Sequence, residues 1–200
     1  MPYINPAQHE QHEMTDEQKL HELMECCDLI ATCLDSGYHW HTKAANGCRR
    51  IKVRGMARWH DEEAVGDSRC LVSFLKLVGD NLKCNPEIDM DHVSKAYMFD
   101  IKNMNDFKAH FEMWRHNETR LIHHLNSAIE LSRCVDLEMY EKLLHINKEV
   151  QNERKRAMMA YDSFEFGGWS NHDISMKSEM IHDYMEHKHI EGQDINFNLG

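Results

Sequence analysis

The sequence has few of the residues that interrupt regular structure, with three prolines and nine glycines among 200 residues. It contains neither GxGxxG nor GxxxxGK[ST], the glycine-rich loops that cradle phosphates in dinucleotide-binding and P-loop proteins. These two routes to nucleotide binding are therefore excluded. Strand-like alternation of apolar and polar residues is also missing, which favours an all-α fold.

Basic residues are outnumbered, with 23 Lys and Arg against 34 Asp and Glu and a formal net charge of -11. The one dense basic run is 154–156, which argues against nucleic acid as a partner because neutralising phosphates takes a concentrated basic surface. No apolar stretch is long enough to span a membrane, and residues 1–18 are polar. Seven cysteines without a CxxC pair indicate free thiols. We expect a cytoplasmic protein without membrane contact.

Apolar residues recur at helical spacing in four long segments. A capping box formed by Thr15 and Gln18 begins the first, Asn46-Gly47 is expected to end it, and Gly79 with Pro86 is expected to end the second. The predicted helices cover 16–46, 51–78, 107–132 and 137–165, with a short helical pattern in the link 87–105.

Two helical hairpins joined by a longer link predict an antiparallel four-helix bundle. We assign a polar N-terminal arm to 1–14, the bundle to 15–166 and an appendix to 167–200, which carries an extra C-terminal helix at about 174–190.

Glu118 lies at the centre of the most apolar helical stripe in the chain. At about 100° per residue, seven apolar side chains fall within roughly 60° of its direction. They are Phe107, Phe111, Trp114, Leu121, Ile122, Leu125 and Ile129. The carboxyl group therefore points into a core, where it is costly unless it is paired, protonated or bound to a metal.

The antiparallel hairpin places Glu118 level with about residue 151, next to Glu153 and Arg154. Two interpretations stay open here. In the first, Glu118 and Glu153 are metal ligands from facing helices, as in carboxylate-bridged di-iron bundles. Alternatively, Arg154 neutralises Glu118 in an internal salt bridge.

His60, Glu63 and Asp67 share one face of the helix predicted for 51–78, at i, i+3 and i+7. Two carboxyl groups and an imidazole on one face suit a metal site, although an ordinary solvated acidic run is the alternative. The helix 16–46 adds Asp35 and His41 at the edge of its stripe, with His39 nearby. The predicted metal ligands are His39, His60, Glu63, Asp67, Glu118 and Glu153, with Glu118 and Glu63 also assigned to catalysis.

Several short motifs, taken in order and spacing, resemble the Dps-type mini-ferritins of the ferritin superfamily. They are His39-Trp40, Leu77-Val78-Gly79 before Pro86, Leu121-Ile122, Ala128-Ile129-Glu130-Leu131, Asp136, Leu143-Leu144 and Ala157-Met158. The resemblance extends over most of the predicted bundle and implies a ferritin-like four-helix bundle with a long crossover between its second and third helices.

The resemblance also implies a function. Ferrous iron, as a di-iron pair or replaced by another divalent metal, would be bound by carboxylates and histidine, oxidised by peroxide or oxygen, and stored in a homo-oligomeric shell. His39 and Asp67 occupy positions that match the family's ligands. The remaining family ligands and the basic DNA-binding tail of some members have no counterpart in this sequence. The Glu-x-x-His set of the wider superfamily is not matched within the predicted bundle, where His60-x-x-Glu63 has the reversed order and Glu149-x-x-Asn152 lacks the histidine.

Two other classes remain open. The first is a non-enzymatic, ferritin-like structural or assembly protein with a decayed metal site. The second is a metal phosphohydrolase of the HD type, which is similar in the order of His60-Asp61, Glu63-Ala64 and Gly66-Asp67.

Overall fold

The computed structural model describes residues 14–96 and 98–167. Within those ranges all regular structure is helical, and no strand is present, so the all-α prediction is confirmed there. The helices are α1 (Asp16–Arg50), α2 (Arg54–Leu82), α3 (Met90–Ala96), α4 (Met104–Ser132) and α5 (Leu137–Gly167). The predicted helix at 174–190 and residues 1–13 of the predicted arm lie outside the described residues.

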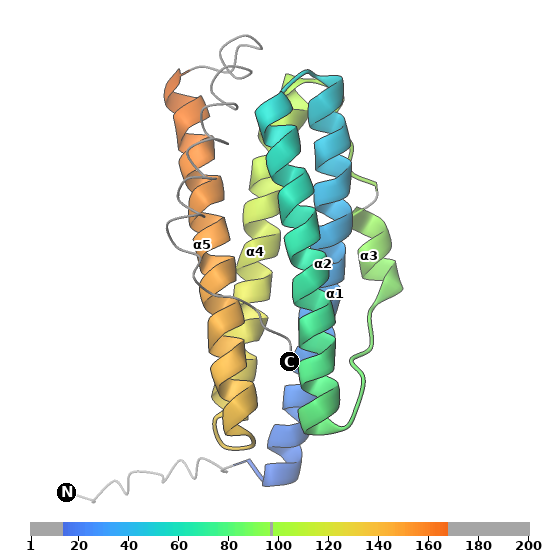
Figure 1. Ribbon diagram of the computed structural model, residues 1–200, viewed down its shortest axis with the longest axis vertical. Coiled ribbons are helices and arrows are strands. Elements are labelled where there is room, and N and C mark those ends of the chain that lie inside the picture. Colours follow the sequence, from blue (N-terminus) through green and yellow to red (C-terminus); the bar gives the residue numbers. More distant parts are fainter. Residues whose placement is uncertain (1–13, 97, 168–200) are drawn as a thin grey trace, which may run out of the picture.

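The four long helices lie side by side along one axis (Figure 1). In that view α1 and α5 ascend, whereas α2 and α4 descend. The segment 83–103 therefore has to return from the lower end of α2 to the upper end of α4, and it carries α3, which packs against α1. Helix α1 contacts α2 and α4, and α4 contacts α5. None of the described helices is both long and apolar enough to cross a membrane.

Helix starts follow the local sequence. Thr15 accepts a hydrogen bond from the Gln18 backbone N–H, and the Gln18 side chain accepts one from the Thr15 N–H, so the predicted capping box is confirmed. A second capping box, formed by Asn103 and Asp106, begins α4 at Met104. This start is three residues before the predicted one because the cap lies upstream of the apolar stripe.

The predicted ends of the first two helices are wrong. Helix α1 continues through Gly47 to Arg50, and a Cβ on Gly47 would lie 2.5 Å from the Cβ of Ile101. This glycine therefore permits close packing of the crossover and does not stop the helix. Helix α2 continues past Gly79 to Leu82 and ends where Lys83 adopts a left-handed conformation, with φ 56°.

Two apolar clusters fill the interior, one above the other in the view of Figure 1. The upper cluster includes Trp40, Trp59, Trp114, Phe107 and Phe164. The lower cluster is mainly aliphatic and includes Leu23, Ile30, Leu34, Leu125 and Leu143. Buried carboxyl groups lie between the two clusters along the helices, which makes this level the candidate site.

Candidate functional site

Seven polar side chains from all four long helices form what we call the polar layer. They are His41 from α1, His60, Glu63 and Asp67 from α2, His110 and Glu118 from α4, and Glu153 from α5. Glu118 and Glu153 are each 8% exposed, and the three histidines are at most 1% exposed. So much buried polarity demands compensation.

The three imidazoles form a continuous chain. His41 Nδ1 lies 2.8 Å from His60 Nδ1, and His60 Nε2 lies 3.1 Å from His110 Nε2. At the far end, His110 Nδ1 hydrogen-bonds the backbone carbonyl of Phe107. Five of the six ring nitrogens are therefore engaged within this chain, and the remaining one is His41 Nε2.

Tryptophan rings enclose this chain and exclude water from it. Trp40 stacks on His110 with ring centroids 5.6 Å apart, and Trp59 stacks on His60 at 5.8 Å. Trp114 lies edge-on to His41 at 5.1 Å. The chain is therefore held in a dry, aromatic environment in which its orientation is restricted.

Carboxyl groups approach the remaining nitrogen. His41 Nε2 lies 3.4 Å from Glu153 Oε1 and 3.9 Å from Asp67 Oδ2. The Glu153 oxygen is buried and has no hydrogen-bond partner, so its contact with His41 lacks hydrogen-bond geometry. Glu118 Oε2 is likewise buried without a partner. The layer thus contains two unsatisfied carboxyl oxygens.

Glu63 has a hydrogen-bond donor and a cation as partners. Trp59 Nε1 donates a hydrogen bond to Glu63 Oε1 at 2.6 Å, and Arg156 Nη2 lies 3.4 Å from the same oxygen. The Arg156 guanidinium therefore forms an ion pair with Glu63 and partly offsets the negative charge of the layer.

Gly37 makes room for Asp67. A Cβ built on this glycine would lie 2.5 Å from Asp67 Oδ2, closer than real Cβ contacts. Because Gly37 continues within α1 and does not break it, its effect is to let the Asp67 carboxyl group approach the α1 backbone.

All four carboxyl groups have raised pKa values. Burial, with a contribution from Glu153, raises the pKa of Glu63 from 4.5 to about 7, against the opposing effect of Arg156. Burial raises the pKa of Glu153 from 4.5 to about 7, against the opposing effects of Arg156 and of the Trp114 N–H. Burial and then the charge of Glu153 hold the pKa values of Glu118 and Asp67 well above their usual range. The metal-free layer therefore retains protons near neutral pH.

The pKa values of the three imidazoles are shifted downward, opposite to those of the carboxyl groups. Burial lowers the pKa of His41 from 6.5 to about 4 and that of His110 to about 3. Burial and the two neighbouring imidazoles hold the pKa of His60 well below its usual value. All three rings are neutral at pH 7.

The structure brings together five of the six residues predicted as ligands: His60, Glu63, Asp67, Glu118 and Glu153. His39 instead faces Asp35, with 3.7 Å between His39 Nε2 and Asp35 Oδ1. Both ring nitrogens of His60 are directed at other imidazoles rather than at carboxyl groups.

Sequence reasoning missed His110 and gave His41 a minor place. His110, Trp114 and Glu118 follow i, i+4, i+8 spacing along one ridge of α4, and this is the signal that identifies His110. For His41 the sequence holds only an edge position on an apolar stripe, because its partners all come from other helices.

The other interpretations of these residues have less support. Glu118 Oε2 and Arg154 Nε are both buried without hydrogen-bond partners, and Arg154 is not among the charges that shift the pKa of Glu118. The predicted salt bridge is therefore not formed by these atoms. Asp61 pairs with Arg49 at the surface, so it does not share a site with the adjacent His60.

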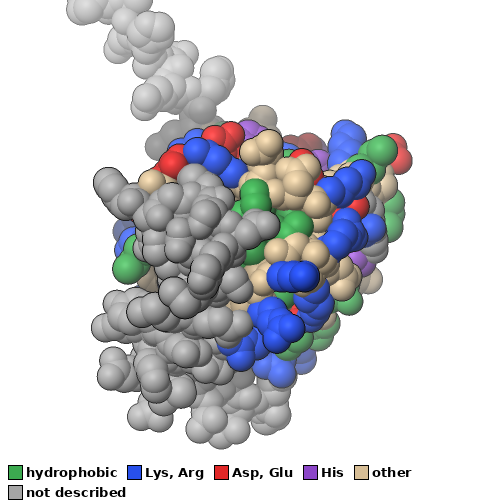
Figure 2. All heavy atoms as spheres, turned by 90° about the horizontal axis from the view of Figure 1, so that it is seen from above, with side chains coloured by type: hydrophobic (Ala, Val, Ile, Leu, Met, Phe, Trp, Pro, Cys, Tyr) green, Lys and Arg blue, Asp and Glu red, His purple; other side chains and the backbone are tan. Residues whose placement is uncertain are grey.

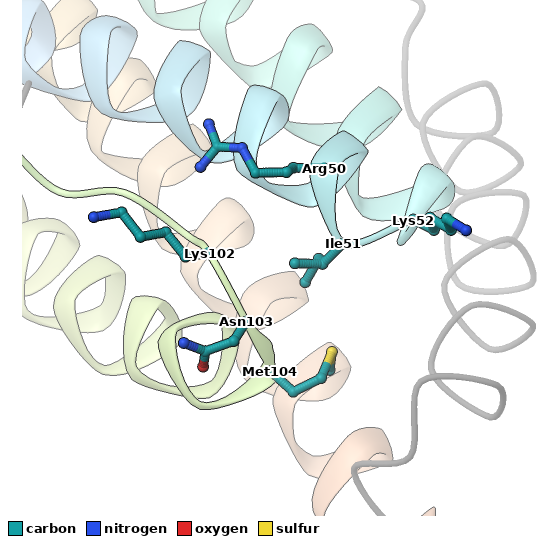
Figure 3. A pocket seen from close by; sticks show the side chains of 6 residues that line it. All are labelled: Arg50, Ile51, Lys52, Lys102, Asn103 and Met104. Atoms are coloured by element: carbon teal, nitrogen blue, oxygen red, sulfur yellow. The ribbon is translucent and has the colours of Figure 1, made fainter.

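Two surface hollows lie away from the polar layer. One lies between the α1–α2 turn and the start of α4, where Ile51 and Met104 reach into the gap (Figure 3). Another is lined by Arg49, Arg54 and Arg58. Viewed from above, Lys and Arg side chains gather on this end of the molecule (Figure 2). Neither hollow includes a residue of the polar layer.

Among the residues that the structure describes, no group of three or more His, Cys, Asp or Glu side chains is arranged to hold a metal ion as it stands. All seven cysteines are free thiols. Family models, curated proteins and solved structures were compared with this chain, and none matches it.

Proposed function

We propose that the polar layer binds a divalent metal, with ferrous iron as the substrate, inside a ferritin-like four-helix bundle that oxidises and sequesters it. The observation that carries the proposal is the pair of buried carboxyl oxygens without partners, Glu118 Oε2 and Glu153 Oε1, in a layer that also holds Glu63 and Asp67. Ionised carboxyl groups at this depth require a cation.

The donor set suits iron or manganese. Carboxylate oxygens and imidazole nitrogen are the ligands that these metals accept in helical bundles. The four carboxyl groups come from three helices, with Glu63 and Asp67 on α2, Glu118 on α4 and Glu153 on α5. A cation among them would replace the protons that the layer holds near neutral pH.

Loading requires movement of side chains, because the metal-free arrangement is not preformed among the described residues. Loss of their protons and rotation about their side-chain bonds would bring the oxygens inward. The helices themselves need not move, since the acids already share one level of the interior.

The topology gives additional support. Two ascending and two descending helices joined by one long crossover are the arrangement of ferritin-like bundles. Bound iron would supply the redox couple, while the protein supplies oxygen ligands and tryptophan walls that exclude water. Storage of more iron than one site holds requires an enclosing shell, so homo-oligomerisation is part of the proposal.

Anaerobic titration of the metal-free protein with ferrous iron tests the binding step, and the absorbance of ferric iron after peroxide or oxygen addition tests the oxidation. We expect stoichiometric binding by the wild type and its loss in Glu118→Gln, which keeps the size of the side chain and removes the charge. Glu112→Gln, at an exposed position on the same helix, is the matched control. Light scattering measures the oligomer.

Failure of the wild type to bind iron stoichiometrically would refute the proposal. Equal affinity in Glu118→Gln would refute the assigned site.

The second candidate is a structural or assembly protein with a decayed site, which is favoured by the absence of a preformed metal group among the described residues. In that case the layer stays protonated, and Glu118→Gln stabilises the protein without altering any response to iron, manganese or zinc.

A further inference from the structure

The hydrogen-bond direction along the imidazole chain is set at one end. A backbone carbonyl only accepts hydrogen bonds, so the contact between His110 Nδ1 and the Phe107 carbonyl places a proton on Nδ1. A neutral imidazole carries one N–H. His110 Nε2 is therefore an acceptor.

The acceptor role of His110 Nε2 determines the donors and acceptors along the rest of the chain, as far as His41. His60 Nε2, 3.1 Å from His110 Nε2, has to donate, which leaves His60 Nδ1 as an acceptor. His41 Nδ1, 2.8 Å from His60 Nδ1, has to donate in turn. His41 Nε2 is then left with a lone pair and no proton.

The chain is neutral because its surroundings are dry. Each imidazole is at most 1% exposed and lies against tryptophan rings, and burial of this kind disfavours an imidazolium. Two protons also do not fit between nitrogens 2.8 Å apart. One proton per contact, counted from Phe107, is the arrangement that satisfies every engaged nitrogen.

His41 Nε2, which carries this lone pair, lies near the acids of the layer, 3.4 Å from Glu153 Oε1 and 3.9 Å from Asp67 Oδ2. A lone pair facing carboxylate oxygens is repulsive unless a proton or a cation lies between them. The contact to Glu153 lacks hydrogen-bond geometry, which leaves the position open to a cation.

We propose that His41 is the nitrogen ligand of the metal site, through Nε2, and that His60 and His110 are positioning residues that fix its tautomer from the Phe107 carbonyl. This inference rests on the function proposed above and specifies the site. It replaces the ligands His39 and His60 that sequence reasoning favoured.

The chain orients His41 and does not conduct protons outward. His110 ends on a carbonyl that has no proton to exchange, and both His110 and Phe107 are fully buried. Metal-ligating histidines commonly donate their second N–H to a fixed acceptor, which sets the tautomer and the ring orientation. Here that acceptor is the imidazole of His60.

The tautomers are measured directly by ¹⁵N NMR of histidine-labelled, metal-free protein at neutral pH. We expect a proton on Nδ1 of His41, on Nε2 of His60 and on Nδ1 of His110. A proton on His41 Nε2, whether as the other tautomer or as imidazolium, would overturn the inference, and this result does not depend on any metal.

Substitution of His110 tests the positioning. His110→Phe removes the acceptor of the His60 Nε2 proton. We expect His60 to adopt the other tautomer, with its proton on Nδ1, so that His41 accepts at Nδ1 and carries its proton on Nε2. Affinity for Mn²⁺ should then fall by about 10- to 100-fold. His110→Gln retains an acceptor oxygen and should preserve both tautomer and affinity, which a merely structural role would not predict. His116→Phe, at an exposed position on α4, is the control.

Ligation is read by electron spin-echo spectroscopy of the Mn²⁺-loaded protein. We expect coupling to an imidazole ¹⁴N in the wild type and in His39→Ala, and loss of that coupling in His41→Gln, which keeps an oxygen donor. Stoichiometric Mn²⁺ without imidazole coupling overturns the ligand assignment and leaves the proposed function standing. No uptake of Mn²⁺ or Fe²⁺ by the wild type overturns both.

Discussion

Replacement of Glu63 by glutamine should stabilise the metal-free protein in a pH-dependent way. The Glu63 side chain is 15% exposed, and its pKa rises from 4.5 in the unfolded chain to about 7 in the fold. A raised carboxyl pKa means that the folded state binds the proton more tightly. Ionisation therefore destabilises the fold increasingly as the pH rises above 4.5 and through 7.

The size of this stabilisation follows from the pKa shift of Glu63. At about 1.4 kcal/mol per pKa unit, ionised Glu63 costs about 3 kcal/mol well above pH 7. At pH 5, where the unfolded side chain is only partly ionised, the cost is about 1 kcal/mol. The stability gained by Glu63→Gln should therefore grow by about 2 kcal/mol between pH 5 and pH 8.5, or roughly 4 to 8 °C in Tm.

The difference between variant and wild type isolates this carboxyl group. The buried histidines act in the opposite sense, because their lowered pKa values reduce stability as the pH falls below 6.5. That contribution is common to both proteins and largely cancels in the difference. The glutamine side chain of the variant also keeps an oxygen that accepts from Trp59, so the 2.6 Å hydrogen bond need not be lost.

Urea unfolding with excess chelator, at half-unit pH steps from 5 to 8.5, measures the difference. Glu130→Gln removes the same charge from an exposed position on α4 and should follow the wild type. A constant difference between Glu63→Gln and wild type across this range would show that the carboxyl group titrates normally in the fold, and the account of the polar layer would then be wrong.

Three further substitutions test one contact of the site, the packing of the crossover and a helix cap. Gly37→Ala should displace the Asp67 carboxyl group, since the new Cβ would lie 2.5 Å from its Oδ2, and Mn²⁺ affinity by calorimetry should fall although helix propensity improves; unchanged affinity would remove Asp67 from the ligand set. Gly47→Ala places a Cβ 2.5 Å from the Cβ of Ile101, so thermal unfolding should show destabilisation by about 1 to 3 kcal/mol, whereas a glycine inside a helix with open space around it would gain stability from the same change. Thr15→Ala removes the acceptor for the Gln18 N–H and should cost about 1 kcal/mol in urea unfolding, with no effect on metal binding.

Much of the secondary structure is readable from the sequence, because helix periodicity and capping are local. The Thr15 capping box and the four long apolar stripes predict α1, α2, α4 and α5 to within a few residues at most ends. Helix termination was less predictable. Gly47 and Gly79 have the composition of helix stops, but α1 and α2 continue past them, and Gly47 packs closely against Ile101, which is distant in the chain.

By itself the sequence determined that Glu118 points inward and that Glu63 and Asp67 share one face of their helix. Glu118 on its apolar stripe, and Glu63 with Asp67 on one face, follow from the angle between successive residues along a helix. That angle does not specify how far one helix slides or rotates against the next.

Only the tertiary structure decided the rest, because the depth and rotation of each helix are set by packing of side chains from all four. It brings His41 of α1 to Glu153 of α5 and excludes the hydrogen bond from Arg154 Nε to Glu118 Oε2. It also joins His41, through two further imidazoles, to the carbonyl of Phe107. The protonation pattern of the layer depends on those contacts between helices, which no single stripe contains.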